Sequence, residues 1–232
     1  MRPSLLPNLL IGAKNNIARG YGNLALFEAA PEFFGRNPGE QRAMASGIRV
    51  GKTAKKDWTN SMRAYDVFDV KADALAVIAA AKGPIEAPQI TTDAPSYYHP
   101  GRSGVIRLGK NVLAYFGELH PAILKALDIK TNVMAFEVFL DNIPLPRDVK
   151  SKAKKKLELS PLQAVDKDLA FVVARNVSAV SIAAAAKNAD RSNIADVRIF
   201  DVYEGENLPE DKKSVAISVT FQPKDKTYTC LL

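Results

Sequence analysis

A short basic stretch divides this chain and constrains its fold more than any other feature. Residues 147–159 (RDVKSKAKKKLEL) carry six Lys and Arg against two Asp and Glu. A Pro-Leu-Pro run ends the apolar segment before it, and Ser160-Pro161 opens a new pattern after it. A charged segment of this kind is typical of a solvated linker. We therefore expect two modules, residues 1–146 and 160–232, joined by a linker.

Charge, apolar runs and cysteine content exclude several classes of protein. The net charge is +7, but residues 160–232 hold nine Lys and Arg against ten Asp and Glu, so the second module is not basic. No run approaches the 18 apolar residues of a membrane span, and the start of the chain lacks the apolar core of a secretory signal. The single cysteine, Cys230, excludes an internal disulfide. These features predict a cytoplasmic protein that does not enter a membrane.

The first module mixes helical and strand patterns without regular βαβ alternation. This mixture predicts an α+β fold with a largely antiparallel sheet. Four prolines within residues 83–102 suggest an irregular connection there. The expected elements are a helix over 5–17, strands over 24–34 and 45–50, a helix over 67–82, a hairpin over 105–119 turning at Gly109-Lys110, a short helix from Pro121 and a strand over 133–140.

The second module has a simpler order. We expect a strand over 169–173, a helix over 178–189, and strands over 197–203 and 215–221. This β-α-β-β order is the first two-thirds of the ferredoxin-like βαββαβ unit. About ten residues follow Phe221, too few for another helix and strand. We therefore expect an incomplete domain, truncated at its C-terminus, whose first strand is an exposed apolar edge.

The segment FDVYEG has a pattern that favours RNA bases. In a strand of period 2, Asp201 and Tyr203 share one face, while Phe200 and Val202 point to the other and enter the core. A tyrosine ring offers a surface on which an unpaired base stacks. A carboxylate accepts hydrogen bonds from base amino groups but repels phosphate, so the pair suits the reading of a base edge. The alternative is an edge tyrosine that is half-packed and has no ligand.

The sequence gives weaker signals for metal, acid–base or phosphate-binding residues. His99 and His120 both stand beside prolines, which favours turn or capping roles; a metal or acid–base site would need a third group such as Glu118 or Asp93. Neither GxxxxGK[ST] nor GxGxxG occurs, so the sequence offers no phosphate loop. The GRSG run at 101–104 is either an arginine held on an anion or a turn with a solvated arginine.

Long ordered motifs then indicate a family. The chain resembles the carboxy-terminal third of the bacterial phenylalanyl-tRNA synthetase β subunit over nearly its whole length. The stretches that carry the resemblance are RPSLLPNLL, NLALFEAAPEFF, DWTNSMRAYDVFDVKAD, YYHPGRSGVIRLG, YFGELHPAILKALDI and VMAFEVFLDNI in the first module, and SPLQAVDKDLAFVV, IADVRIFDVYEGENLPEDKKSVAISVTFQ and KTYT in the second. The resemblance implies a class II synthetase-like module without catalytic residues, followed by a ferredoxin-fold anticodon-binding domain.

The resemblance also implies partners and a role. It implies an (αβ)2 heterotetramer in which the α subunit activates phenylalanine with ATP and magnesium, so this chain itself holds no cofactor or metal and is non-catalytic alone. It implies that Tyr203 stacks on an anticodon base of the tRNA while Asp201 and Ser214 bond to base edges. The expected function is subunit assembly and anticodon recognition in charging tRNA with phenylalanine. The alternative is a truncated fragment that acts only as a protein-interaction module, without specific tRNA binding.

Overall fold

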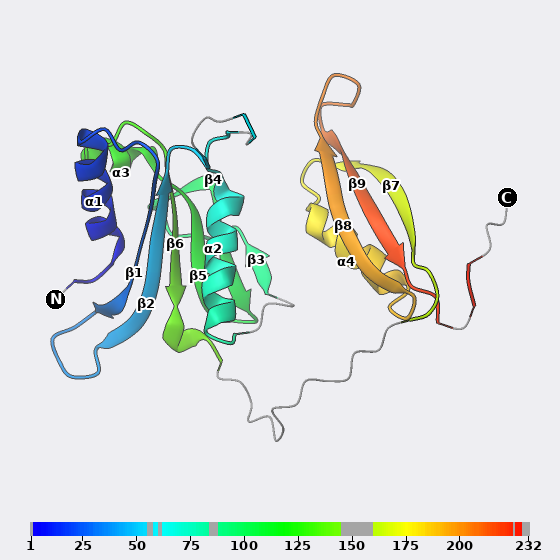
Figure 1. Cartoon of the computed structure of the whole chain (residues 1–232), viewed down its shortest axis with the longest axis horizontal. Coiled ribbons are helices and arrows are strands. Elements are labelled where there is room, and N and C mark those ends of the chain that lie inside the picture. The colour runs from blue at the N-terminus through cyan, green and yellow to red at the C-terminus, as the bar shows by residue number, and fades with distance from the viewer. Residues whose placement is uncertain are drawn as a thin grey trace. The chain divides into compact units, whose positions relative to one another are not determined.

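The protein forms two compact units, Met1–Ser151 and Lys152–Leu232, in a computed structural model. The structure describes residues 2–54, 58–59, 62–83, 88–144, 160–224 and 226–228. The linker predicted at 147–159 and Cys230 lie outside the described residues. Figure 1 shows a larger unit of sheet and helices and a smaller unit with its own sheet.

The first unit is built on an antiparallel sheet of six strands in the order β1-β2-β6-β5-β4-β3. Every strand pairing in it is antiparallel, which confirms the predicted α+β class. Pro31 lies within an edge strand. Proline is tolerated in edge strands because it lacks an N–H, and one side of such a strand has no neighbour to bond. The strands are β1 (Leu24–Phe33), β2 (Gln41–Val50), β3 (Gln89–Thr91), β4 (Tyr98–Leu108), β5 (Asn111–Leu119) and β6 (Val133–Phe139).

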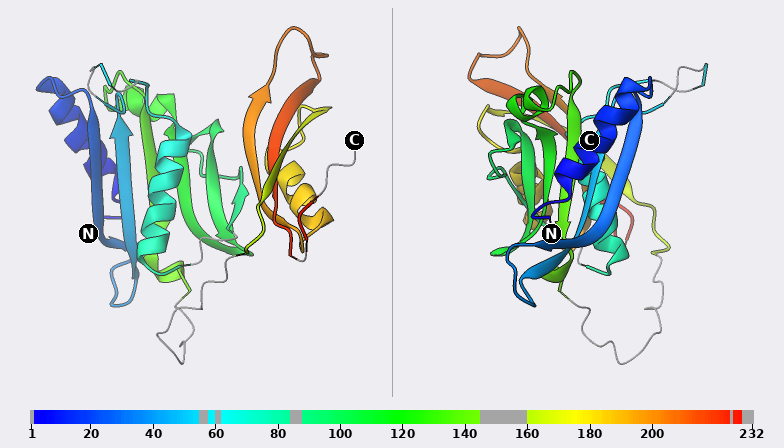
Figure 2. Two further views of the ribbon diagram at one scale, coloured as in Figure 1. Left: turned by 45° about the vertical axis from the view of Figure 1, so that its right-hand side comes forward. Right: turned by 90° about the vertical axis from the view of Figure 1, so that its left-hand side faces the viewer.

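Two helices pack on opposite faces of this sheet (Figure 2). Helix α1 (Leu6–Ala18) buries its leucines against β2 and β6 residues such as Ile48 and Ala135. Helix α2 (Val67–Ala80) buries Val70, Ala74 and Ile78 against the other face. It begins at a capping box in which the Asp66 and Asp69 side chains each accept from the other's backbone N–H, which fixes its start. Both helices confirm the sequence prediction to within a few residues.

The described part of the proline-rich region, residues 88–102, is more ordered than its prolines suggest. The prediction of an irregular connection is wrong in part, because β3 lies inside it and β4 begins at Tyr98. Three residues of β3 pair with β4 at the sheet edge, a position that tolerates short strands between prolines. The turn predicted at Gly109 is confirmed; its φ of 61° is in the left-handed region that glycine adopts readily.

Both histidines have local structural roles. His120 Nδ1 accepts from the backbone N–H of Ala122 at 3.2 Å and so caps helix α3 (Pro121–Ala126). His99 Nδ1 accepts from the backbone N–H of Gly101 at 3.1 Å. The predicted capping and turn roles are therefore confirmed. A short 3₁₀ helix, η1 (Leu140–Asn142), follows β6.

The second unit has the predicted β-α-β-β order. It comprises β7 (Val165–Ala174), α4 (Ala179–Ala189), β8 (Ile194–Tyr203) and β9 (Lys212–Phe221), and the three strands form an antiparallel sheet in the order β7-β9-β8. Ser178 caps α4 by accepting from Ser181 N–H. The helix covers one face, where the small core gathers around the buried side chains Ile194, Val215, Ile217 and Val219. Figure 1 shows α4 on one side of this sheet.

Strand β7 is an apolar edge of this sheet, as expected from the sequence. Leu169 and Phe171 pair with Ile217 and Val215, so they lie on the face that α4 covers. They are nevertheless 44% and 39% exposed, since α4 packs mainly on β8. A strand edge with exposed apolar side chains favours association.

Candidate nucleic-acid interface

The register of β9 decides which side chains the sheet presents on each face. Val215, Ile217 and Val219 are buried against α4. The alternate side chains of β9 therefore point to the opposite face, which we call the open face. Residues paired directly across antiparallel strands share a face. The side chains assigned to the open face in this way are Asp166, Asp168, Ala170, Val172 and Ala174 of β7; Lys212, Ser214, Ala216, Ser218 and Thr220 of β9; and Asp196, Arg198, Asp201 and Tyr203 of β8.

All three predicted site residues lie on this open face. Tyr203 is paired directly with Ser214, and Asp201 is paired with Ala216, the next open-face residue along β9. The Tyr203 ring is 44% exposed and Asp201 is exposed, while Ser214 in the central strand is half-buried. The phenol, the carboxylate and the hydroxyl thus form one group at one end of the sheet.

A β-bulge at Phe200 produces this arrangement. Ile199 pairs with Ile217, but the next pair is Asp201 with Ala216, so Phe200 is the extra residue. Ile199, not Phe200, packs against the core, and Phe200 is 52% exposed; the prediction that Phe200 enters the core is wrong. Strict alternation from Ile199 would turn Asp201 towards the core. The bulge reverses the alternation and turns Asp201 and Tyr203 outwards.

Gly205 permits the position of the Tyr203 ring. A Cβ built on Gly205 would lie 2.1 Å from the Tyr203 hydroxyl oxygen and 2.3 Å from Cζ. The hydroxyl end of the phenol therefore lies against the glycine, while the Tyr203 side chain stays 44% exposed. The sequence analysis missed Gly205, because only the fold of the turn after β8 brings it under the ring. Nearby, Arg175 and Glu204 form an ion pair at 2.6 Å.

The charge of the open face disfavours phosphate. Its ionisable side chains are acidic in excess, four aspartates against two cations: Asp166, Asp168, Asp196 and Asp201 against Arg198 and Lys212. Apart from Lys212 near its start, the central strand presents small side chains on this face, Ser214, Ala216, Ser218 and Thr220, so a base meets no bulky side chain there. A flat, acidic surface with one aromatic ring suits base edges, whose amino groups donate, better than the phosphate backbone.

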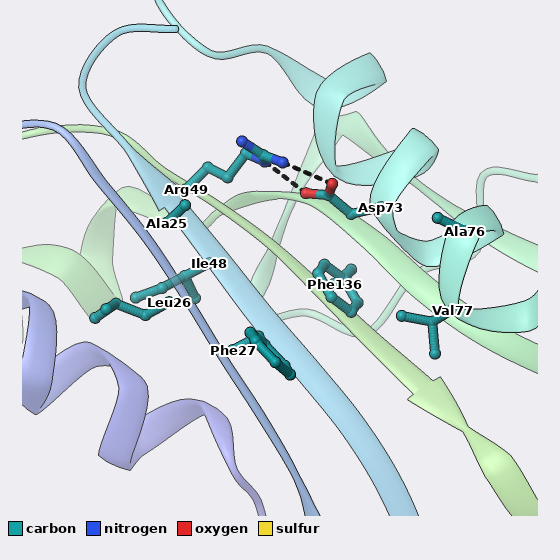
Figure 3. Close-up of a pocket in the computed structure, with 9 residues that line it drawn as sticks. All are labelled: Ala25, Leu26, Phe27, Ile48, Arg49, Asp73, Ala76, Val77 and Phe136. Atoms are coloured by element: carbon teal, nitrogen blue, oxygen red, sulfur yellow. Dashed lines mark hydrogen bonds and ion pairs between the residues drawn. The ribbon is translucent and has the colours of Figure 1, made fainter. Parts of the chain in front are cut away.

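The first unit carries a separate hollow over β1 and β2. It has a volume of about 300 Å³ and is lined by apolar side chains, among them Phe27, which is 78% exposed, and Val77 of α2. Arg49 donates to Asp73 through Nε at 2.5 Å and through a second nitrogen at 2.7 Å (Figure 3). This bidentate bond raises the pKa of the Arg49 guanidinium and ties β2 to α2.

Metal ligands do not gather in the described part of the chain. Within residues 2–54, 58–59, 62–83, 88–144, 160–224 and 226–228, no group of three or more His, Cys, Asp and Glu side chains could hold a metal ion. Arg102 of the GRSG run forms an ion pair with Glu118 at 2.8 Å, so its charge is already partnered.

No helix among the described residues is long and apolar enough to cross a membrane.

Comparison with known proteins identifies the family. Residues 1–140 match the phenylalanyl tRNA synthetase beta chain CLM domain, and residues 160–229 match the ferredoxin-fold anticodon binding domain. The phenylalanine–tRNA ligase beta subunits of Rhodospirillum rubrum and Paramagnetospirillum magneticum are 51% and 47% identical over 98% and 99% of this chain. The chain spans only 28% and 29% of these relatives' own lengths. The first match alone covers more than half of the chain, and the chain therefore belongs to the phenylalanyl-tRNA synthetase beta chain family.

Proposed function

We propose that this chain contributes anticodon recognition and subunit assembly to an enzyme that charges tRNA with phenylalanine. The observation that carries the proposal is the open face, where Tyr203, Asp201 and Ser214 stand together on an acidic, flat sheet. Relatives named phenylalanine–tRNA ligase beta subunit and the match to an anticodon-binding domain support it.

Each of the three side chains has a distinct proposed role. The Tyr203 ring stacks on an unpaired anticodon base, an interaction worth roughly 1–3 kcal/mol. Asp201 accepts hydrogen bonds from a base amino group, and Ser214 donates to or accepts from a base edge, since a hydroxyl does both. The aspartates on the same face keep phosphates away, so the bases rather than the backbone meet the sheet.

Charging requires ATP and magnesium, and in this proposal neither is bound by this chain. The described residues include no cluster of metal ligands, and the sequence has no glycine-rich phosphate loop. The proposal places activation on a partner, an α subunit, with which this chain forms an (αβ)2 assembly. In this proposal the chain alone is not a catalyst.

The first unit has a surface suited to that assembly. Phe27 is 78% exposed beside the apolar hollow over β1 and β2. Large exposed apolar side chains next to a hollow are typical of protein interfaces. This observation favours a second candidate function, a protein-interaction module without specific tRNA binding. Co-expression with an α subunit followed by size exclusion tests the assembly role: one joint peak is expected, and two separate peaks would oppose it.

Binding of tRNA separates the two candidates. The chain is titrated with the phenylalanine tRNA and with the same tRNA carrying a different anticodon. Recognition predicts tighter binding of the first, and Tyr203→Ala should remove most of that difference. Tyr21→Ala is the matched control, because Tyr21 is 63% exposed but lies in the first unit. Equal affinity for the two tRNAs would leave only the interaction module.

A further inference from the structure

The first unit holds a second cavity, separate from the hollow over β1 and β2. It lies between α1, α3 and the sheet face that α1 covers, and its volume is about 530 Å³. That volume is in the range of small-molecule sites, which is about 300–1,000 Å³. Most of the wall is apolar and includes Leu6, Leu10, Leu119, Ile123 and Leu127.

The polar end of the cavity is built around a buried carboxylate. Glu137 of β6 is only 4% exposed. Its Oε2 accepts from the Tyr97 hydroxyl at 2.7 Å and from the Tyr98 hydroxyl at 3.2 Å. Its Oε1 has one distant donor, the Ser4 hydroxyl at 3.5 Å. A carboxylate oxygen offers about two acceptor sites, so Oε1 retains room for a strong donor.

The charges around the cavity leave this carboxylate without a cation. The other lining acid, Glu32, accepts from Arg42 at 3.1 and 3.2 Å and from the backbone N–H of Leu5 at 3.0 Å. Arg42 is the one cation among the lining residues, and its charge offsets that of Glu32. Burial, together with the charge of Glu32, raises the pKa of Glu137, while the hydrogen bonds from Tyr97 and Tyr98 and the charge of Arg42 oppose this rise.

A second polar group nearby also lacks a partner. Ser46 of β2 is paired directly with Glu137 of β6, so both side chains lie on the same face of the sheet. Ser46 is 0% exposed, and its Oγ has no hydrogen-bond partner among the described residues. An unbonded buried hydroxyl is unusual and costs about 1–3 kcal/mol. Ser46 itself does not line the cavity, so it adds a buried polar group beside Glu137 rather than a contact for a ligand.

We propose that this cavity binds a small organic cation, a primary ammonium ion on an apolar body. The ammonium donates to Glu137 Oε1, the oxygen that has room for a strong donor, and supplies the missing positive charge. The apolar body packs against the leucine and isoleucine side chains from α1, α3 and β5. This site is independent of the proposed anticodon reading, because it lies wholly in the first unit.

The test compares two probes that differ only in the polar group. Phenethylamine carries the ammonium, and 2-phenylethanol replaces it with a hydroxyl on the same apolar body. Calorimetric titration of the whole chain should give at least about tenfold tighter binding of the amine, since a charge-assisted bond to a buried carboxylate exceeds a neutral one. Equal affinity for the two probes, or no binding of either, would overturn the proposal.

Variants assign the effect to this cavity. Glu137→Gln should abolish the preference for the amine while the alcohol still binds, and a preference that survives would contradict the proposal. Glu118→Gln is the matched control, because Glu118 is equally buried at 3% exposure but does not line the cavity, and it should keep the preference. Ala126→Phe should block both probes, since Ala126 is an exposed residue at the cavity wall. Unchanged binding in that variant would locate the probes elsewhere.

Discussion

Substitution of Gly205 offers a precise way to move one aromatic ring. A Cβ at this position would lie 2.1 Å from the Tyr203 hydroxyl oxygen. Non-bonded carbon contacts are favourable only at about 3.5–4.0 Å, so in Gly205→Ala the ring must retreat by more than about 1 Å. The backbone of Gly205 is not in the left-handed region, so alanine adds no strain there. Stability should change by no more than about 0.5 kcal/mol.

The effect on RNA binding follows from stacking. One base stacked on Tyr203 is worth roughly 1–3 kcal/mol, which corresponds to about 5- to 140-fold in Kd. We expect Gly205→Ala to weaken binding of an anticodon stem-loop by a large part of the loss seen in Tyr203→Ala. Fluorescence anisotropy with labelled stem-loop measures both variants and the double variant.

The double variant distinguishes support of the Tyr203 ring from an independent role of Gly205. If Gly205 acts only by supporting the ring, Gly205→Ala should cost nothing further once Tyr203 is already alanine. An equal loss in both backgrounds would mean that Gly205 acts independently of Tyr203. Wild-type affinity in Gly205→Ala alone would refute the claim that the ring position matters.

Three further predictions concern stability and association. Ile217 is 0% exposed in the small core of the second unit, so Ile217→Ala should lower the free energy of unfolding by about 2–5 kcal/mol. In calorimetry this variant should lower the melting temperature of the second unit only, whereas Ile106→Ala should lower that of the first unit only. Phe171→Lys should reduce self-association of the chain in sedimentation, because a charge on an exposed edge strand opposes pairing, and unchanged association would argue against β7 as the contact. Burial raises the folded-state pKa of Glu137 above its ordinary 4.5, so the contribution of Glu137 to the free energy of unfolding falls as pH rises above 4.5. The wild type should therefore lose stability relative to Glu137→Gln as pH rises from 4.5. A difference in unfolding free energy between the two proteins that stays constant with pH would contradict the raised pKa.

Local patterns predicted most of the fold. Apolar periodicity located α1 and α2, and the β-α-β-β order of the second unit followed from alternating strands separated by one alanine-rich helix. Caps and turns were visible in the sequence at Ser178 and Gly109, because each has a local chemical cause. The short strand β3 was missed, since three residues among prolines carry no periodic signal and pair only because β4 lies beside them.

The bulge at Phe200 could not be read from the sequence. The segment VRIFDVY alternates well enough for a regular strand, and the extra residue shows only in the pairing with β9. The sequence prediction placed Asp201 and Tyr203 on one outward face, which the register confirms, while its assignment of Phe200 to the core was wrong. The roles of Asp201, Tyr203 and Ser214 in reading bases stay a prediction.

The cavity beside Glu137 had no sequence signal. Glu137 stands inside an apolar strand pattern, and its neighbours Ser4, Tyr97 and Ser46 are 40 or more positions away along the chain. Sites assembled from such distant residues depend on the tertiary fold, which local periodicity does not encode.

Mapping backbone amide shifts during an RNA titration tests whether the open face of the second unit reads RNA bases. The anticodon stem-loop of the phenylalanine tRNA is added to isotope-labelled chain, with a stem-loop of changed loop sequence as the control. The account predicts shifts concentrated at Asp201, Tyr203 and Ser214 for the first RNA and much smaller ones for the second. Shifts confined to α4, or identical shifts with both RNAs, would contradict it.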